Sequence, residues 1–248
     1  MITVDDGRSG RWDDMTVTSE GARSRLLTTA RKLFAERGLD AVSLREIIRE
    51  AGVKHATAIQ YHFGDREGLI AAILATHEAR VDTRREAMLD QYEATGIPDR
   101  RTIAAIMVRP LARELEDQDG RHFLRINAQV VQRPPPGGIF VDTGTSMWRW
   151  RRQAAEFLPP GAAELHTRYT ALTFTTVELA RRAGQPQHFD DQLFVSRITD
   201  VVSAIVEAPL SPETERLYTE RHERHQQRDA RRREALTLPQ TPSNDRPA

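Results

Sequence analysis

Residues 43–63 read SLREIIREAGVKHATAIQYHF, and their spacing predicts two short helices joined by a tight turn. Ser43 stands three residues before Glu46, which is the spacing of a capping box at a helix N-terminus. Leu44, Ile47 and Ile48 then recur on one helical face until Gly52 ends that helix. A second segment, from about residue 56 to residue 62, has the length of one further short helix.

The residues on both sides extend this helical pattern. An apolar stripe precedes it and a glycine, Gly38, ends that first helix. After the short pair, Asp65 can cap a long fourth helix. The apolar positions of these two flanking helices are Leu26, Leu27, Ala30, Leu33 and Phe34 in the first, and Leu69, Ile70, Ile73 and Leu74 in the fourth.

Three short helices in about fifty residues, with a glycine-containing turn between the last two, predict a helix-turn-helix. Its last helix can enter a major groove only if one face carries small and polar groups. Ile59 and Phe63 would anchor the other face. Between residues 21 and 76 nine basic residues face six acidic ones, a surplus that suits a phosphate-contacting surface. The predicted outer face carries Lys54, His55, Thr57, Gln60 and Tyr61.

The same segment resembles the N-terminal domain of tetracycline-repressor (TetR) family regulators over about fifty residues. Order, spacing and residue type agree together, whereas the rest of the chain matches only in being helical. The residues that carry the resemblance are Leu26-Leu27, Ala30, Leu33-Phe34-Ala35-Glu36-Arg37-Gly38, Ala41-Val42-Ser43, Glu46-Ile47, Ala51-Gly52-Val53, Tyr61-His62-Phe63 and Leu69.

The resemblance implies that Ser43 lies near a phosphate, that Arg45 reaches a base edge or a phosphate, and that Arg66 contacts a phosphate. From Gly52 to Phe63 the chain is one residue longer than the commonest family spacing, so which residue between 54 and 57 reaches a base stays open. The residues expected to contact DNA are Ser43, Arg45, Lys54, His55, Thr57, Gln60, Tyr61, His62 and Arg66.

The whole chain predicts an all-α fold of about nine to ten helices. We expect a disordered extension over residues 1–19, the helix-turn-helix domain over 20–67, a ligand-binding and dimerisation domain over 68–210, and a charged, partly disordered tail over 211–248. Pro110 should kink or divide a helix at about 99–117. Residues 134–138, PPPGG, predict a loop, and Ile139, Phe140 and Val141 are too few to found a sheet.

Two apolar helices, at about 162–183 and 190–207, are expected to form a four-helix bundle with a second copy. A symmetric homodimer would read a pseudo-palindromic operator in double-stranded DNA. The body would hold a small-molecule effector, with Trp148 and Phe174 as candidate pocket residues. The predicted dimer contacts are Leu165, Leu172, Val177, Phe194, Ile198, Val201 and Ile205.

Composition limits the chemistry and the cellular location that we expect of this protein. The chain is 39% apolar and 29% charged, with a formal net charge of zero, which is an ordinary globular balance. It has no cysteine, which excludes disulfides and thiolate chemistry. No secretory signal and no membrane-spanning run is apparent, so we expect a cytoplasmic protein. We expect no cofactor.

The function expected from the resemblance is a repressor released from DNA by a small molecule; a ligand-dependent activator or a co-repressed regulator of the same fold is the alternative. A helical enzyme is a remote third, since no GxGxxG, GxxxxGK[ST], GxSxG or HExxH pattern occurs. An architectural DNA binder would not need the large apolar body. His55, His62 and His77 lack partners at metal-ligand spacing, so no metal is expected.

The charged tail permits two interpretations. Arg228 and Arg231 to Arg233 could add sequence-independent affinity for DNA through phosphate contacts. The acidic residues of the tail nearly balance its arginines, and we therefore favour a solvated charged helix.

Overall fold

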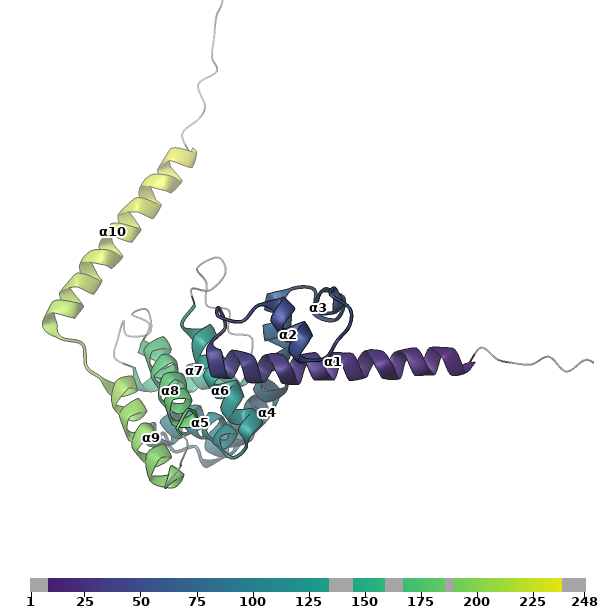
Figure 1. Cartoon of the computed structure of the whole chain (residues 1–248). Helices are drawn as coiled ribbons and strands as arrows, with labels where there is room; N and C mark the ends of the chain where they lie inside the picture. The colour runs from purple at the N-terminus through teal and green to yellow at the C-terminus, as the bar shows by residue number, and fades with distance from the viewer. Residues whose placement is uncertain (1–8, 134–144, 159–166, 186–189, 238–248) are drawn as a thin grey trace, which may run out of the picture.

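The computed structural model describes residues 9–133, 145–158, 167–185 and 190–237, with the backbone alone for residues 9–19, 145, 167–168 and 232–237. Within these ranges the chain is helical and contains no strand, which confirms the predicted all-α class (Figure 1). The helices are α1 (Ser9–Arg37), α2 (Leu44–Glu50), α3 (Ala58–Phe63), α4 (Arg66–Thr95), α5 (Arg100–Ala112), α6 (Gln118–Val131), α7 (Thr145–Ala154), α8 (Thr167–Ala183), α9 (Asp191–Glu207) and α10 (Pro212–Thr237).

The first helix is longer than the sequence predicted. A disordered extension was expected over residues 1–19, whereas α1 begins at Ser9. Residues 11–20 hold neither proline nor glycine, and adding a turn to an existing helix avoids the cost of nucleation. The other predicted domain limits remain predictions.

The N-terminal helices enclose a small apolar core. Leu26, Phe34, Ile47 and Leu69 are fully buried, and Ile59 is nearly so. They come from α1, α2, α3 and the first turns of α4, so the apolar stripes expected at this end of the chain meet inside one domain. This core fixes the angle at which α3 is held.

Helix α4 connects the N-terminal domain with the body. Its N-cap, Asp65, accepts a hydrogen bond from the Gly68 amide at 2.8 Å, as the sequence predicted. The helix packs on α1 and α3 and also on α5, α6 and α7. Helix α4 is therefore part of both the N-terminal domain and the body.

Helix α5 is the centre of the body. Ile103, Ile106 and Met107 are fully buried, and the helix is covered by α4, α7, α8 and α9. Pro110 lies inside α5, which ends at Ala112 and continues as a 3₁₀ turn, Arg113–Leu115. The proline therefore precedes a tightened helix end and does not divide two α-helices.

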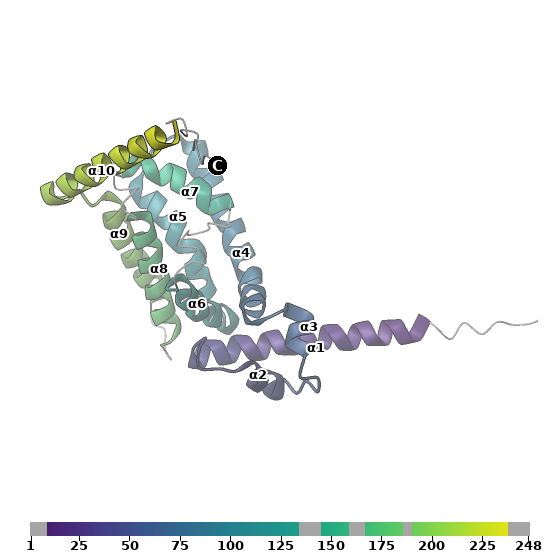
Figure 2. The same cartoon turned by 90° about the horizontal axis from the view of Figure 1, so that it is seen from above.

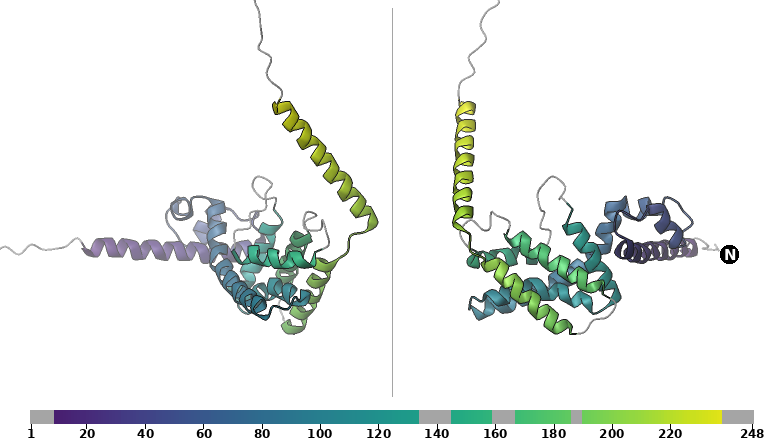
Figure 3. Two further views of the ribbon diagram at one scale, coloured as in Figure 1. Left: turned by 180° about the vertical axis from the view of Figure 1, so that it is seen from behind. Right: turned by 60° about the vertical axis from the view of Figure 1, so that its left-hand side comes forward.

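The last helix, α10, projects from the body. Figures 1 and 3 show it leaving the end of α9 and rising away from the other helices. Figure 2, which views the molecule from above, shows α10 and the N-terminal helices α1–α3 at opposite ends of it. The predicted loop at 134–138 and the apolar residues 139–141 lie outside the described residues.

Candidate nucleic-acid interface

Helix α2 begins at the predicted cap. The Ser43 hydroxyl accepts a hydrogen bond from the Glu46 amide at 3.2 Å. The Glu46 carboxylate is bound by the Arg37 guanidinium, whose hydrogen bond lowers the pKa of Glu46, and the Ser43 amide lowers it further. The cap and the end of α1 are thus joined through one carboxylate.

The turn between α2 and α3 is exposed. Lys54, His55, Ala56 and Thr57 all face solvent, and α3 begins only at Ala58. Thr57 occupies the N-cap position, but its side chain makes no capping hydrogen bond. The Thr57 hydroxyl therefore does not cap α3.

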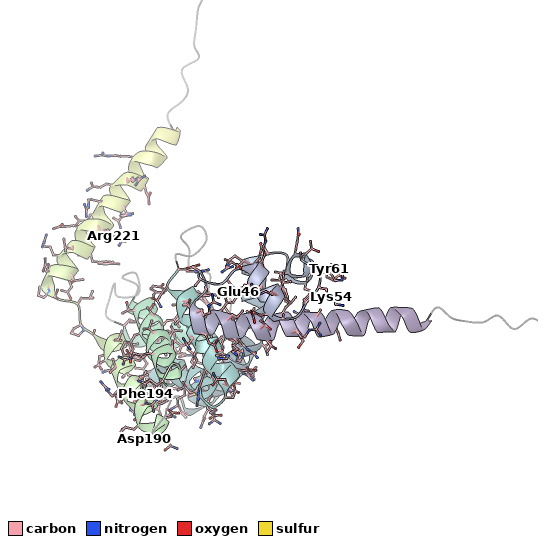
Figure 4. All side chains as sticks on the ribbon, viewed as in Figure 1. Glu46, Lys54, Tyr61, Asp190, Phe194 and Arg221 are labelled. Carbon is pink, nitrogen blue, oxygen red and sulfur yellow. The ribbon has the colours of Figure 1, made fainter. Side chains whose placement is uncertain are left out.

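Helix α3 has one buried side and one exposed side. Ala58 and Ile59 are buried, Gln60 is exposed, and the Tyr61 side chain is 79% exposed. Figure 4 shows Lys54 and Tyr61 close together at the outer edge of the N-terminal domain. An aromatic side chain this exposed contributes little to the core, so Tyr61 is available to a partner.

His62 and Arg45 complete the outer surface. His62 is half-buried, and its ring meets the Tyr61 ring edge-on with 4.9 Å between centroids. Arg45, on the first turn of α2, is exposed. Apart from Arg66, the predicted contact residues therefore lie on the turn, on α3, or at the start of α2.

Arg66 makes contacts within the N-terminal domain. Its guanidinium donates hydrogen bonds to the Leu39 and Val42 carbonyl oxygens, the second at 2.7 Å, and lies 5.2 Å from the centroid of the Phe34 ring. Both carbonyls belong to the segment between α1 and α2. These bonds hold that segment in place, which is a role that the sequence did not predict for Arg66, and its phosphate contact stays a prediction.

The N-terminal domain is attached to α6 of the body by polar contacts that the sequence did not predict. The Leu39 amide donates to Gln129 Oε1 at 2.7 Å. Arg133 pairs with Asp40 at 2.5 Å, and Arg31 of α1 pairs with Asp119 at 2.5 Å. The segment that follows α1 therefore takes its position from α6 as well as from Arg66.

A buried carboxylate fastens α4 to the end of α5. Glu114 is 1% exposed and receives hydrogen bonds from His77 at 2.6 Å, Arg84 at 2.7 Å and Arg80 at 2.8 Å. Burial alone would raise the pKa of Glu114, but these three partners outweigh it and lower the pKa to about 2. His77, considered above as a metal ligand, serves this ion cluster and stacks on Phe123.

The two predicted ligand-pocket residues are not brought together. Trp148 is 66% exposed on α7, whereas Phe174 of α8 packs partly buried against the core. Trp150 is the buried member of the tryptophan pair, and its indole donates to the Ile103 carbonyl at 2.8 Å.

A hollow of about 450 Å³ lies where the end of α1 meets α6 and α8. It therefore touches the N-terminal domain as well as the body. Its lining includes neither predicted residue and consists of Ala35, Glu36, Arg37, Gly38, Arg125, Ala128, Gln129, Gln132, Val177, Ala180 and Arg181.

The residues predicted to form the dimer face on α8 and α9 differ in their exposure. Val177 is exposed, and Leu172, Phe194, Val201 and Ile205 are half-buried. Ile198 is 4% exposed because it packs inside the protomer, so its assignment to the face was wrong. Leu165 lies outside the described residues. Leu193, which is 65% exposed, belongs to the same part of α9.

Within the described residues, no three histidine or acidic side chains are grouped so as to hold a metal ion. None of the described helices is long and apolar enough to cross a membrane.

Comparison with known proteins places the resemblance at the N-terminus. Residues 26–73 match the family model described as "Bacterial regulatory proteins, tetR family". The HTH-type transcriptional regulator UidR of Escherichia coli (strain K12) is 31% identical over 72 residues, which are 29% of this chain and 36% of UidR. The HTH-type transcriptional repressor KstR2 of Rhodococcus jostii (strain RHA1) is 39% identical over 106 residues, covering 34% of this chain and 52% of KstR2.

The chain thus spans about a third to a half of the length of the curated relatives it matches. Among solved structures, a TetR-family regulator from Streptomyces coelicolor A3 aligns over 75% of this chain and 95% of its own, with 20% identity and a TM-score of 0.38. RolR in complex with resorcinol aligns over 79% of this chain and 98% of its own, with 20% identity and a TM-score of 0.32.

Proposed function

We propose that this chain, which belongs to the tetR family of bacterial regulatory proteins by its residues 26–73, is a DNA-binding transcriptional regulator without catalytic activity. The observation that carries the proposal is α3, with Ala58 and Ile59 buried and Gln60 and Tyr61 exposed. A helix anchored on one side and polar on the other can enter a major groove. The proposal places the protein in the cytoplasm, where the DNA is.

In this proposal, phosphate contacts orient the domain and base contacts choose the sequence. Ser43 and Arg45, at the start of α2, meet the backbone or a base edge. The side-chain amide of Gln60 can donate one hydrogen bond to an adenine edge and accept another from it. Lys54, His55 and Thr57 lie in the lengthened turn, and Tyr61 and His62 lie towards the end of α3.

A homodimer would present two such helices to a pseudo-palindromic operator. The half-buried apolar residues of α8 and α9, together with exposed Leu193, supply a face that a second copy would cover. Exposed apolar area of this kind favours association. A two-fold axis through this face would relate two N-terminal domains, as recognition of successive major grooves requires.

We further propose that the protein is a repressor that a small molecule releases from DNA; KstR2 is likewise named a transcriptional repressor. A ligand weakens DNA binding only if it prefers a conformer that binds DNA poorly. The bonds of Gln129 and Arg133 to the segment after α1 provide a route from the body to the N-terminal domain. A ligand that displaces α6 would displace that segment too.

The test is binding of the full-length protein to DNA flanking its own gene, with unlabelled competitor DNA of unrelated sequence. Saturable binding that survives the competitor is expected, and Gln60→Ala should lower affinity about 5- to 160-fold, equivalent to about 1 to 3 kcal/mol. Arg109→Ala, an exposed arginine on α5, is the matched control and should bind as the wild type does. Equal affinity of wild type and Gln60→Ala would remove α3 as the reading element.

A further inference from the structure

Helix α10 carries a stripe of arginines on one face, although the acidic and basic residues of the helix nearly balance in number. Arg221, Arg224, Arg228 and Arg231 are separated by three, four and three residues, and all four are exposed. At 3.6 residues per turn this spacing places them on one face. Figure 4 shows Arg221 on the part of α10 that stands clear of the body.

No acidic residue between Arg221 and Arg231 lies on this face. By the same periodicity Glu223 and Asp229 each lie about 120° from the middle of the stripe, one on either side, and Glu220 borders the stripe at about 60°. Arg216 pairs with Glu220 at 2.5 Å, and no described carboxylate forms an ion pair with any of the four stripe arginines. Arg224 does donate to the Glu220 backbone carbonyl at 3.2 Å. The helix is therefore polarised although its total charge is nearly balanced.

The part of this face that carries the arginines does not pack on the body, because every described residue from Thr219 to Arg231 is exposed. Leu217, which continues the stripe towards the body, is 47% exposed. Two copies of α10 facing each other through the stripe would bring like charges together, which is unfavourable. The partner that complements the face is therefore an extended array of negative charge.

We propose that the Arg221–Arg231 face of α10 binds the phosphate backbone of DNA as a second, sequence-independent contact surface. Ten residues of helix span about 15 Å, and duplex DNA carries one negative charge per roughly 1.7 Å of its axis. Arginine suits this partner because its guanidinium binds phosphate oxygens through two parallel hydrogen bonds. The arm rises on the side of the molecule on which α2 and α3 lie over α1 (Figure 1).

This surface rests on the proposed function only in taking DNA as its partner, and it contributes affinity without choosing a sequence. Because the arm and the helix-turn-helix belong to one chain, DNA bound by the helix-turn-helix is at a raised local concentration around the arm. It should also act alone on DNA of arbitrary sequence. The near balance of acidic and basic residues in the tail favoured a solvated helix; this proposal assigns α10 a DNA-binding surface instead.

The test uses the full-length protein carrying Arg221→Gln, Arg224→Gln, Arg228→Gln and Arg231→Gln together. Glutamine keeps the helix propensity and removes the charge. Affinity for an arbitrary-sequence duplex is measured across a salt series. Because each lost phosphate contact lowers the slope of log affinity against log salt by about 0.9, the slope should become shallower by about 3 to 4 for each arm.

The matched control removes four exposed arginines that lie outside α10: Arg100→Gln, Arg109→Gln, Arg113→Gln and Arg152→Gln. It has the same net charge as the stripe variant and should keep the wild-type slope. The proposal is overturned if the two variants have equal slopes. It is also overturned if the stripe variant keeps the wild-type slope but changes its sedimentation coefficient, since the face would then serve a protein contact.

The two proposals fail in different ways. Gln60→Ala should reduce the preference for the specific duplex and leave binding to arbitrary DNA unchanged. The stripe variant should weaken binding to both duplexes by the same factor and keep their ratio. Loss of that ratio in the stripe variant alone would contradict a sequence-independent role for the arm.

Discussion

Arg45 and Arg66 carry the same charge but have different surroundings. Arg45 is exposed on the first turn of α2, whereas Arg66 is held by two backbone carbonyls and the Phe34 ring. A guanidinium can bridge two acceptors and stack on an aromatic ring at once, and an ammonium can do so only in part. The two arginines should therefore respond differently to substitution.

Arg66→Lys should lower the free energy of unfolding by about 1 to 2 kcal/mol, because a charge-assisted hydrogen bond to a partly buried carbonyl is lost. The salt slope of DNA binding should stay as in the wild type. Arg45→Ala should show the reverse. Its free energy of unfolding should lie within about 0.5 kcal/mol of the wild-type value, and the salt slope of its DNA binding should be shallower by about 0.9. Urea unfolding and salt titrations measure both, and a shallower slope for Arg66→Lys at unchanged stability would identify Arg66 as a phosphate contact.

Glu114 should make the stability of the body depend on acid pH. Its pKa is moved from 4.5 to about 2, which corresponds to roughly 3 kcal/mol at about 1.4 kcal/mol per pH unit. Because the folded-state pKa is lowered, this stability is complete above about pH 4.5 and is lost as the pH falls towards about 2. The difference in unfolding free energy between wild type and Glu114→Gln should therefore shrink on acidification.

The measurement is urea unfolding of both proteins from neutral pH down to about pH 3. A difference that stays constant over this range would mean that the carboxylate is not held ionised by His77, Arg80 and Arg84.

At the scale of elements, the corner between α3 and α4 is closed by Gly68. A Cβ added there would collide with the Phe63 carbonyl oxygen, which is backbone and has little room to move. Inside a helix, glycine to alanine ordinarily stabilises by about 1 kcal/mol. At Gly68 the collision should reverse the sign, because relief requires α3 to shift against α4.

Gly68→Ala should lower the free energy of unfolding by about 1 to 3 kcal/mol, the usual cost of forcing an atom into packed structure. Gly21→Ala is the matched control. Its Cβ would meet only the flexible Arg25 side chain, at 3.6 Å, and the variant should be as stable as wild type or more so. Thermal unfolding of both variants decides the matter; a stabilised Gly68→Ala protein would mean that the corner is not tightly packed.

Local signals were predictable from the sequence, and contacts between distant residues were not. Ser43 and Asp65 cap helices through residues three positions away, so spacing alone identified them. Arg66 meets carbonyls 24 and 27 residues earlier, and Glu114 is bound by residues 30 to 37 positions earlier. Those pairings depend on how the helices pack, which no local pattern contains.

The dimer face illustrates the same limit within one helix. Periodicity identified the apolar side of α9, but this side is broad enough to face both the protomer and a second copy. Ile198 turned inward and Leu193 outward, and only the packing of α5 and α8 against α9 separates the two. The arginine stripe of α10 could have been found from its spacing alone, but counting charges hid it.

At the scale of the whole molecule, recognition of a pseudo-palindromic operator requires two copies of the chain. Leu193→Glu places a charge on the exposed apolar part of α9 and should shift the protein from dimer to monomer in sedimentation velocity, because burying an unpaired charge is costly. Ile97→Glu changes an equally exposed apolar residue, 70% accessible and distant in sequence, and should leave the dimer intact. Dimers that persist in Leu193→Glu would move the contact away from this part of α9.

The most direct test of the central claim is selection of preferred duplexes from a random pool by the full-length protein. The account predicts enrichment of one sequence with inverted half-sites whose centres lie about 10 base pairs, or a multiple of that, apart, as two symmetry-related α3 helices require. The Gln60→Ala variant should enrich sequences that differ within each half-site. A pool that stays random under conditions in which the protein binds DNA would contradict the claim that α3 reads base sequence.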